Sequence, residues 1–111
     1  MLMTNPDFVR SVTATVDLTV ARFVTLAGAY PAAGGYAIGV TYSSGKTGDL
    51  VPYVIEETAE VEVGEAIAVG DALMSDASGK AMKLTGTNTK VGRAMSAAAA
   101  GGTIEALLIP N

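Results

Sequence analysis

VEVGEAIAVGDALMSDASGKAM, residues 61–82, is the stretch that decides the fold. Gly64, Gly70 and Gly79 divide it into short apolar runs, and Asp and Ser residues lie beside them. Glycine adopts positive φ freely, and Asp and Ser side chains hydrogen bond to nearby backbone, so these residue types favour turns. The stretch is therefore predicted to form strand, turn, strand, turn, strand, and none of its residues is a predicted catalyst or ligand.

Short strands are also predicted on both sides of this stretch. Period-two alternation of apolar and polar residues, or a short apolar run between turns, predicts strands over residues 12–19, 22–26, 36–42, 50–57, 91–95 and 103–109. Residues 72–75 and 80–84 are predicted to form a hairpin around the turn 76–79. Pro52 indicates a sheet edge or a bulge. Glu60 and Glu62 alternate with valines, which favours a solvated outer face. Helical periodicity is not found, so we predict an all-β fold, either a small antiparallel β-barrel or a sandwich.

A weak internal repeat relates residues 38–55 to residues 91–109. Each segment consists of a strand, a loop that contains glycine, and an apolar strand. Two related halves of one barrel would produce this pattern, and so would chance similarity in a composition rich in small residues. We predict an extended N-terminal arm over residues 1–10, which show no periodicity, and a single β domain over residues 11–111.

Composition excludes several classes of function. The chain has 111 residues with no cysteine and no histidine, which removes disulfides, thiolate and imidazole metal ligands, and Ser-His or Cys-His nucleophile pairs. The net charge of −4 argues against binding to nucleic acid. An apolar run long enough for a transmembrane helix is absent, and the N-terminus does not resemble a signal peptide.

Charged residues make up 16% of the chain, against about 25% in a typical soluble domain. A chain with so little charge and so much Ala, Gly and Val is expected to hide surface against a partner. The alternative is a stable monomer whose surface carries small residues.

Two motifs suggest other chemistry. Gly45-Lys46-Thr47 resembles the end of a phosphate-binding loop, but that motif has a glycine where this chain has Val40, and a helix follows it. Ala81-Met82-Lys83 resembles the acceptor tripeptide of biotinyl and lipoyl carrier domains, in which the lysine lies at the tip of a hairpin. The predicted turn at 76–79 places Lys83 down a strand instead. A carrier or small binding module of this type remains the alternative function.

Carboxylates are dense around residues 56–65, but they do not have the spacing of a calcium loop. A weak cation site or an enzyme with a carboxylate-bound metal is therefore a lesser alternative. We predict no catalytic residues, no metal site and no cofactor, so we do not expect an enzyme.

Taken together, residues 11–110 resemble the capsid cement, or head decoration, proteins of tailed phages. The resemblance rests on the order and spacing of short motifs: RFVTL at 22–26, GAYP at 28–31, GYAIGV at 35–40, GD at 48–49, VGEAI at 63–67, GDALMSD at 70–76, GKA at 79–81, VGRA at 91–94 and LLIP at 107–110. It implies a small β-rich, non-catalytic protein of the virion that binds the major capsid protein on the outer surface of the assembled head and stabilises the shell. It also implies a homo-oligomer, most often a trimer.

The N-terminal arm matches none of these motifs. It carries apolar residues without a periodic face to bury in its own domain, and Pro6 favours an extended backbone at Asn5. We therefore predict that the arm contacts the capsid, with the candidate residues Leu2, Met3, Asn5, Pro6, Phe8, Val9 and Arg10.

Overall fold

A computed structural model describes residues 9–55 and 58–108 of the chain. Nine strands and no helix are found in these residues. The strands are β1 (Val9–Thr13), β2 (Phe23–Val24), β3 (Gly39–Thr41), β4 (Leu50–Val54), β5 (Thr58–Glu62), β6 (Ala72–Ser75), β7 (Ala81–Lys83), β8 (Gly92–Ala94) and β9 (Thr103–Leu108). In the described part of the chain there is consequently no helix that could cross a membrane.

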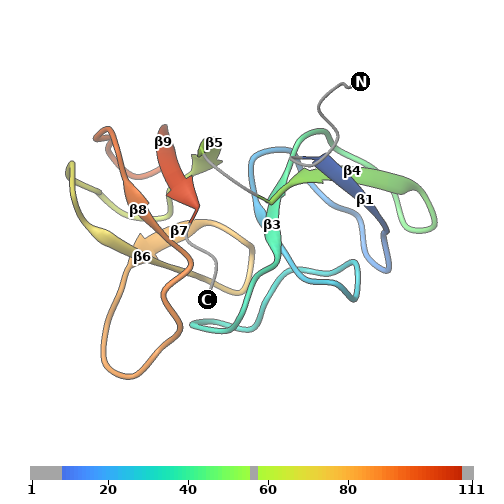
Figure 1. Ribbon diagram of the computed structural model, residues 1–111, viewed down its shortest axis with the longest axis horizontal. Coiled ribbons are helices and arrows are strands. Elements are labelled where there is room, and N and C mark those ends of the chain that lie inside the picture. The colour runs from blue at the N-terminus through green and yellow to red at the C-terminus, as the bar shows by residue number, and fades with distance from the viewer. Residues whose placement is uncertain (1–8, 56–57, 109–111) are drawn as a thin grey trace, which may run out of the picture.

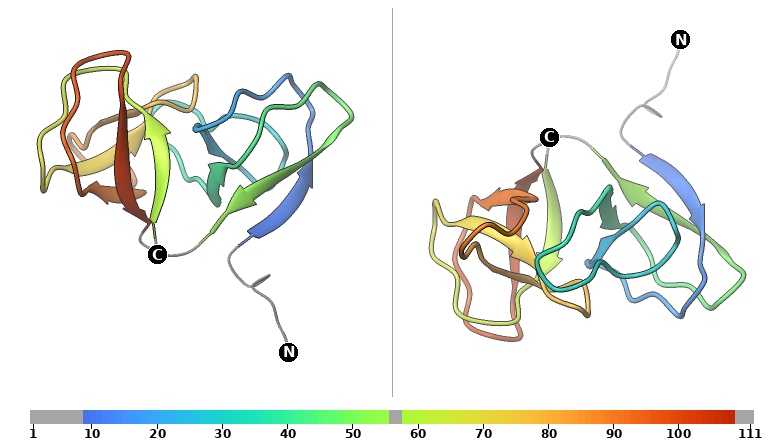
Figure 2. Two further views of the ribbon diagram at one scale, coloured as in Figure 1. Left: turned by 90° about the horizontal axis from the view of Figure 1, so that it is seen from above. Right: turned by 90° about the horizontal axis from the view of Figure 1, so that it is seen from below.

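The strands form two antiparallel sheets, with the orders β1-β4-β3-β2 and β5-β9-β8-β6-β7. Figures 1 and 2 show the two sheets side by side as two lobes. The all-β prediction is confirmed. Of the two predicted architectures the sandwich fits, since the sheets remain separate and do not close into one barrel.

The two sheets are built from two copies of the same unit, here called repeat 1 (residues 9–54) and repeat 2 (residues 58–108). β1, β2, β3 and β4 of repeat 1 correspond to β5, β6, β8 and β9 of repeat 2, and each pairs with the equivalent neighbour. β7 is an additional strand at the edge of the second sheet. The internal repeat suggested by the sequence is therefore confirmed, and it extends over almost the whole described chain.

Hydrogen bonds outside the ladders repeat in the same way. Leu18 and Gly45 exchange two backbone hydrogen bonds, and so do Ile67 and Ala98 in repeat 2. Ala14 N–H donates to the carbonyl of Asp49, as Val63 N–H donates to that of Gly102. The two repeats therefore follow the same plan in loops as well as in strands.

Alternation along the strands builds the hydrophobic core. β9 alternates exposed and buried residues along its whole length, with Ile104, Ala106 and Leu108 buried. One buried cluster is formed mainly by repeat 2 and the other by repeat 1. Phe23 and Val40 belong to repeat 1 but are buried in the cluster of repeat 2. The two lobes therefore share a buried core.

The bounds of the first predicted strand differ in the structure. The strand predicted over 12–19 is β1, which begins at Val9 and ends at Thr13. Val9 and Arg10, assigned to the arm from the sequence, thus belong to the sheet. The chain then turns away, and Val16 is 40% exposed although it continues the alternation.

Pro52 lies in β4, which is an interior strand between β1 and β3, so the prediction of an edge or bulge is wrong. Its carbonyl accepts a hydrogen bond from Tyr42 N–H just after β3 ends. The nitrogen and the carbonyl of one strand residue face the same side, so the missing N–H of Pro52 also faces the end of β3. At the equivalent place in repeat 2, Glu105 N–H donates to the Ser96 hydroxyl instead. Proline is tolerated here because the neighbouring strand stops.

Candidate functional site

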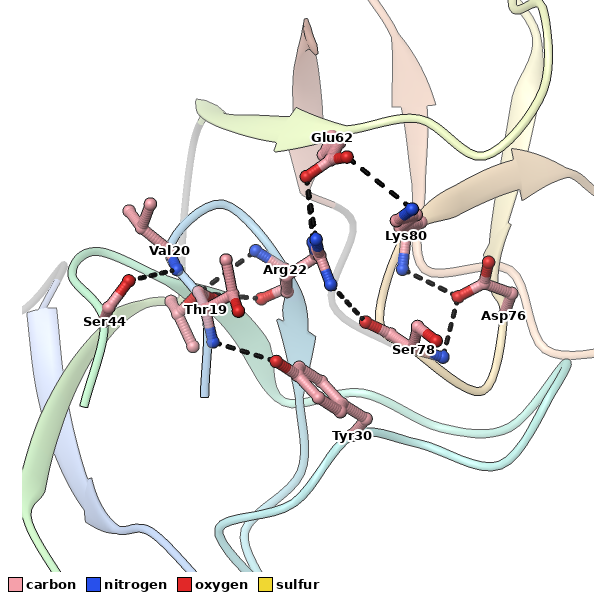
Figure 3. Close-up of polar contacts among 10 residues, drawn as sticks. Thr19, Val20, Arg22, Tyr30, Ser44, Glu62, Asp76, Ser78 and Lys80 are labelled. Atoms are coloured by element: carbon pink, nitrogen blue, oxygen red, sulfur yellow. Dashed lines mark hydrogen bonds and ion pairs between the residues drawn. The ribbon is translucent and has the colours of Figure 1, made fainter. Parts of the chain in front are cut away.

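The joint between the repeats is held by charged side chains around Arg22, shown in Figure 3. The Arg22 guanidinium donates to Glu62 Oε1 through Nε at 3.1 Å and Nη2 at 2.9 Å, and through Nη1 to the Ser78 carbonyl at 3.1 Å. Lys80 Nζ lies 3.6 Å from Glu62 Oε2. The backbone adds one more bond, from Glu62 N–H to the Ala21 carbonyl at 2.8 Å. These contacts join repeat 1 to β5 and to the β6–β7 turn.

Glu62 is therefore an ion-paired residue of the joint, so the predicted solvated outer face is confirmed for the exposed Glu60 but holds only in part for Glu62. Its side chain is 25% exposed, and that of Arg22 is 14% exposed. Hydrogen bonds from Arg22 lower the pKa of the Glu62 carboxyl below its ordinary value, against an opposing effect of desolvation. The sequence could not show this pairing because Arg22 lies 40 positions away.

The β6–β7 turn docks against repeat 1. Asp76 Oδ1 accepts hydrogen bonds from the N–H groups of Ser78 at 2.8 Å and Lys80 at 2.9 Å, which fixes the turn predicted from the sequence. Phe23 N–H donates to the Gly79 carbonyl at 2.7 Å. Gly79 has φ +79°, and a Cβ there would lie 2.7 Å from the Phe23 carbonyl oxygen. Only glycine satisfies both the turn and this close approach.

The loop with Gly45-Lys46-Thr47 connects β3 to β4 and is not followed by a helix. Asp17 accepts hydrogen bonds from the N–H and hydroxyl groups of Thr47. Both bonds lower the pKa of the Asp17 carboxyl, and the bond from the backbone N–H has the larger effect. The Lys46 side chain is 84% exposed, with Nζ 4.0 Å from Asp17. A surface hairpin loop is the arrangement observed, and it lacks the helix N-terminus that a phosphate-binding loop uses.

Lys83 lies on β7 and is exposed, and its N–H donates to Glu65 Oε2. It is separated from the β6–β7 turn by Ala81 and Met82, so it is not at the hairpin tip as the carrier alternative requires. Within residues 9–55 and 58–108 there is no group of three carboxylates that could hold a metal ion.

Large apolar side chains are exposed at equivalent places in the two repeats. Val20 and Tyr42 in repeat 1 are 43% and 66% exposed, and their counterparts Val69 and Met95 are 67% and 49% exposed. In repeat 1, the N–H of Ala21, the residue after Val20, donates to the carbonyl of Thr41, the residue before Tyr42. In repeat 2, the N–H of Gly70 donates in the same way to the carbonyl of Ala94. These bonds bring the two exposed side chains of each repeat close together. The sequence did not single out these residues, because their exposure depends on where β3 and β8 end.

A groove of about 530 Å³ runs between the repeats. Repeat 1 lines it with apolar residues that include Val20, Tyr42 and Val54, and repeat 2 lines it with β5 and with Glu105. The groove therefore has a mainly apolar wall from repeat 1, and a mixed wall from repeat 2 that carries two acids, Glu60 and Glu105.

Most of the residues predicted to contact the capsid lie outside the described residues: Leu2, Met3, Asn5, Pro6 and Phe8. The remaining two are on β1, where Val9 pairs with Val54 and Arg10 with Tyr53. Arg10 is exposed at this sheet edge. The structure thus places the beginning of β1 beside Val54, which lines the groove.

Comparison with known proteins was made against families, curated proteins and solved structures. A family model described as phage cement protein matches residues 5–109. None of the curated proteins matches the chain. Among solved structures, the N base of the head fiber protein gp8.5 of bacteriophage phi29 is similar, with a TM-score of 0.78 and 20% sequence identity, over 91% of this chain and 92% of that chain.

Proposed function

The chain belongs to the phage cement protein family, and from that membership we propose that it decorates the outer surface of the phage head and stabilises the assembled shell. The match over residues 5–109 is the observation that carries the proposal. The partner is the major capsid protein. A protein that binds only the assembled, expanded shell stabilises that state by mass action, and it needs no catalytic site.

Two features of the structure support this role. The exposed apolar side chains, among them Tyr42, Leu50 and Val69, provide surface that a stable interface would cover. The shared core and the joint at Arg22 hold the two repeats as one body, so little order has to be gained on binding. The similar fold of the phi29 head fiber N base supports a place on the phage head.

We propose further that the protein acts as a trimer on the head. A contact between one surface of a subunit and a different surface of the next closes into a ring when the rotation per subunit fits. The low charged fraction of 16% and the exposed apolar residues of both repeats favour such contacts.

The N-terminal segment is proposed to attach the domain to the capsid. Leu2, Met3, Asn5, Pro6 and Phe8 precede the first strand, and Val9 and Arg10 begin it. Apolar side chains such as Leu2, Met3 and Phe8 would gain free energy by burial against a neighbouring protein.

Purified protein should be mixed with expanded capsids that lack it, and the particles then heated. We expect saturable co-sedimentation and a higher temperature of capsid disruption with protein than without. Binding without a change in the disruption temperature would support decoration but contradict shell stabilisation. Absence of binding would contradict both.

A further inference from the structure

We propose that the free edge of β5 binds an extended segment of the capsid protein, in which basic and apolar side chains alternate, as an additional strand. This inference rests on the proposed function and assigns the groove between the repeats as the contact site.

The backbone of β5 has unused hydrogen-bonding groups. The N–H of Glu62 donates to the Ala21 carbonyl and so points away from β9. Because the backbone groups of strand residues two apart point to the same side, the N–H and C=O groups of Thr58 and Glu60 also point away from β9. Within the described chain, no backbone partner is found for the outward N–H and C=O of Glu60. Such an edge is a template for an added strand.

Opposite this edge stands the apolar wall of the groove. Val54 lies on it, and Val20 and Tyr42 extend it toward solvent. Side chains of an added strand alternate between two faces. Side chains on one face of the added strand would therefore pack on these three residues. Side chains on its other face would continue the outer surface of the second sheet. The volume of about 530 Å³ is that of a pocket able to bury a short segment.

The outer surface beside the edge carries an unbalanced pair of acids. Glu60 and Glu105 are opposite each other in the β5–β9 register, so their side chains lie next to one another on the same face. Both are exposed, and neither forms an ion pair with any described residue. Like charges directly opposite each other destabilise a sheet. A lysine or arginine on the added strand would neutralise this pair.

Residues 1–8 contain Asp7 and neither lysine nor arginine, and residues 109–111 contain no charged side chain, so neither stretch has the basic residues that would complement Glu60 and Glu105. On the proposed function, the polypeptide that supplies the basic segment is the capsid protein.

The direct test is Glu60→Pro, measured by binding to expanded capsids. Proline removes the outward N–H of Glu60 but none of the bonds between β5 and β9, and it is tolerated on edge strands. The internal repeat offers a matched control, Ser11→Pro, because Ser11 holds the equivalent outward position on the edge of β1. We expect Glu60→Pro to weaken binding by about tenfold or more, the loss expected for one or two interface hydrogen bonds, while Ser11→Pro binds like the wild type.

A second variant, Glu60→Gln with Glu105→Gln, keeps the backbone and removes the charge. It should melt no lower than the wild type, yet bind capsids more weakly and with a smaller loss of binding between about 50 and 300 mM salt. If wild-type protein binds and both altered proteins bind equally well, the β5 site is wrong and the proposed function stands. If wild-type protein does not bind capsids, the proposed function itself fails. Self-association abolished by Glu60→Pro, with capsid binding unchanged, would assign the edge to a second copy and overturn the proposal.

Discussion

Arg22 is the residue on which the joint between the repeats depends most, because its guanidinium reaches both β5 and the β6–β7 turn. The residue before it, Ala21, has φ 65°, a left-handed conformation that is unfavourable for alanine by about 1–2 kcal/mol. Its equivalent in repeat 2 is Gly70, with φ 91°. Repeat 1 thus has a strained alanine next to the joint, whereas repeat 2 has an unstrained glycine at the equivalent position.

Replacing Glu62 by Gln should lower stability at neutral pH by about 1 kcal/mol, because the charge-assisted hydrogen bonds from Arg22 weaken. Because the pKa of Glu62 is lowered in the folded state, its contribution is present above the ordinary value of 4.5 and is lost as the pH falls through the lowered pKa. Denaturant unfolding of both proteins from pH 7 to pH 2 should show their difference vanish in acid. Glu60→Gln, on the same strand without an ion pair to a described residue, is the control and should cause no loss of stability at neutral pH. A difference for Glu62→Gln that is as large at pH 2 as at pH 7 would contradict the ion-pair account.

Substitutions at the two equivalent left-handed positions should have opposite effects. Gly70→Ala meets no atom within 4 Å of the new Cβ, so its cost of about 1–2 kcal/mol comes from the backbone alone. Ala21→Gly should leave stability unchanged or raise it by up to about 1 kcal/mol, as relief of strain exceeds the added entropy of the unfolded chain. Thermal unfolding of both variants measures this. A clear loss of stability in Ala21→Gly would show that the alanine side chain is needed at the joint.

Among the elements, β2 has only two residues but contributes to both buried clusters. Its two residues divide between the cores, with Phe23 in the cluster of repeat 2 and Val24 in that of repeat 1. A short strand of this kind is what makes two small sheets, each poorly able to bury a core alone, into one folding unit.

Phe23→Ala should therefore destabilise both repeats together, by about 3–5 kcal/mol. Leu26→Ala is the control, since Leu26 is 66% exposed and should change stability by less than about 0.5 kcal/mol. Hydrogen exchange measured along the chain should show amide protection lost in repeat 1 and repeat 2 in parallel. Loss confined to one repeat would mean that the two unfold independently.

Elements governed by local chemistry were predictable from the sequence. The β6–β7 hairpin follows from the turn residues around Asp76 and Gly79, and β9 follows from strict alternation. The end of β1 at Thr13 and the tolerance of Pro52 in an interior strand were not predictable, because both depend on where a partner strand stops. The groove was not predictable either, because Val54 and Glu105 line it together only after both sheets have formed.

At the scale of the whole molecule, duplication gives two similar units with different surfaces. Repeat 1 presents Tyr42 where repeat 2 presents Met95, and repeat 2 presents Glu60 and Glu105 where repeat 1 has Ser11 and Pro52. One backbone plan thus supplies an apolar wall from one copy and an acidic strand edge from the other.

Removal of residues 1–8 should separate attachment from folding. β1 begins at Val9, so the truncation leaves the described strands intact and the melting temperature should change little. Binding to capsids should weaken clearly, because the apolar residues proposed to contact the capsid are gone. Equal binding by truncated and full-length protein, compared by titration of the same capsids, would assign attachment wholly to the β domain.

The central claim is that this protein decorates the outer surface of the phage head. Electron cryo-microscopy of expanded capsids saturated with purified protein tests it most directly. We expect added density on the outer surface, fitted by the two-sheet domain, in groups of three, and with the edge of β5 next to a capsid protein segment. Capsids without added outer density, or with density only inside the shell, would contradict it.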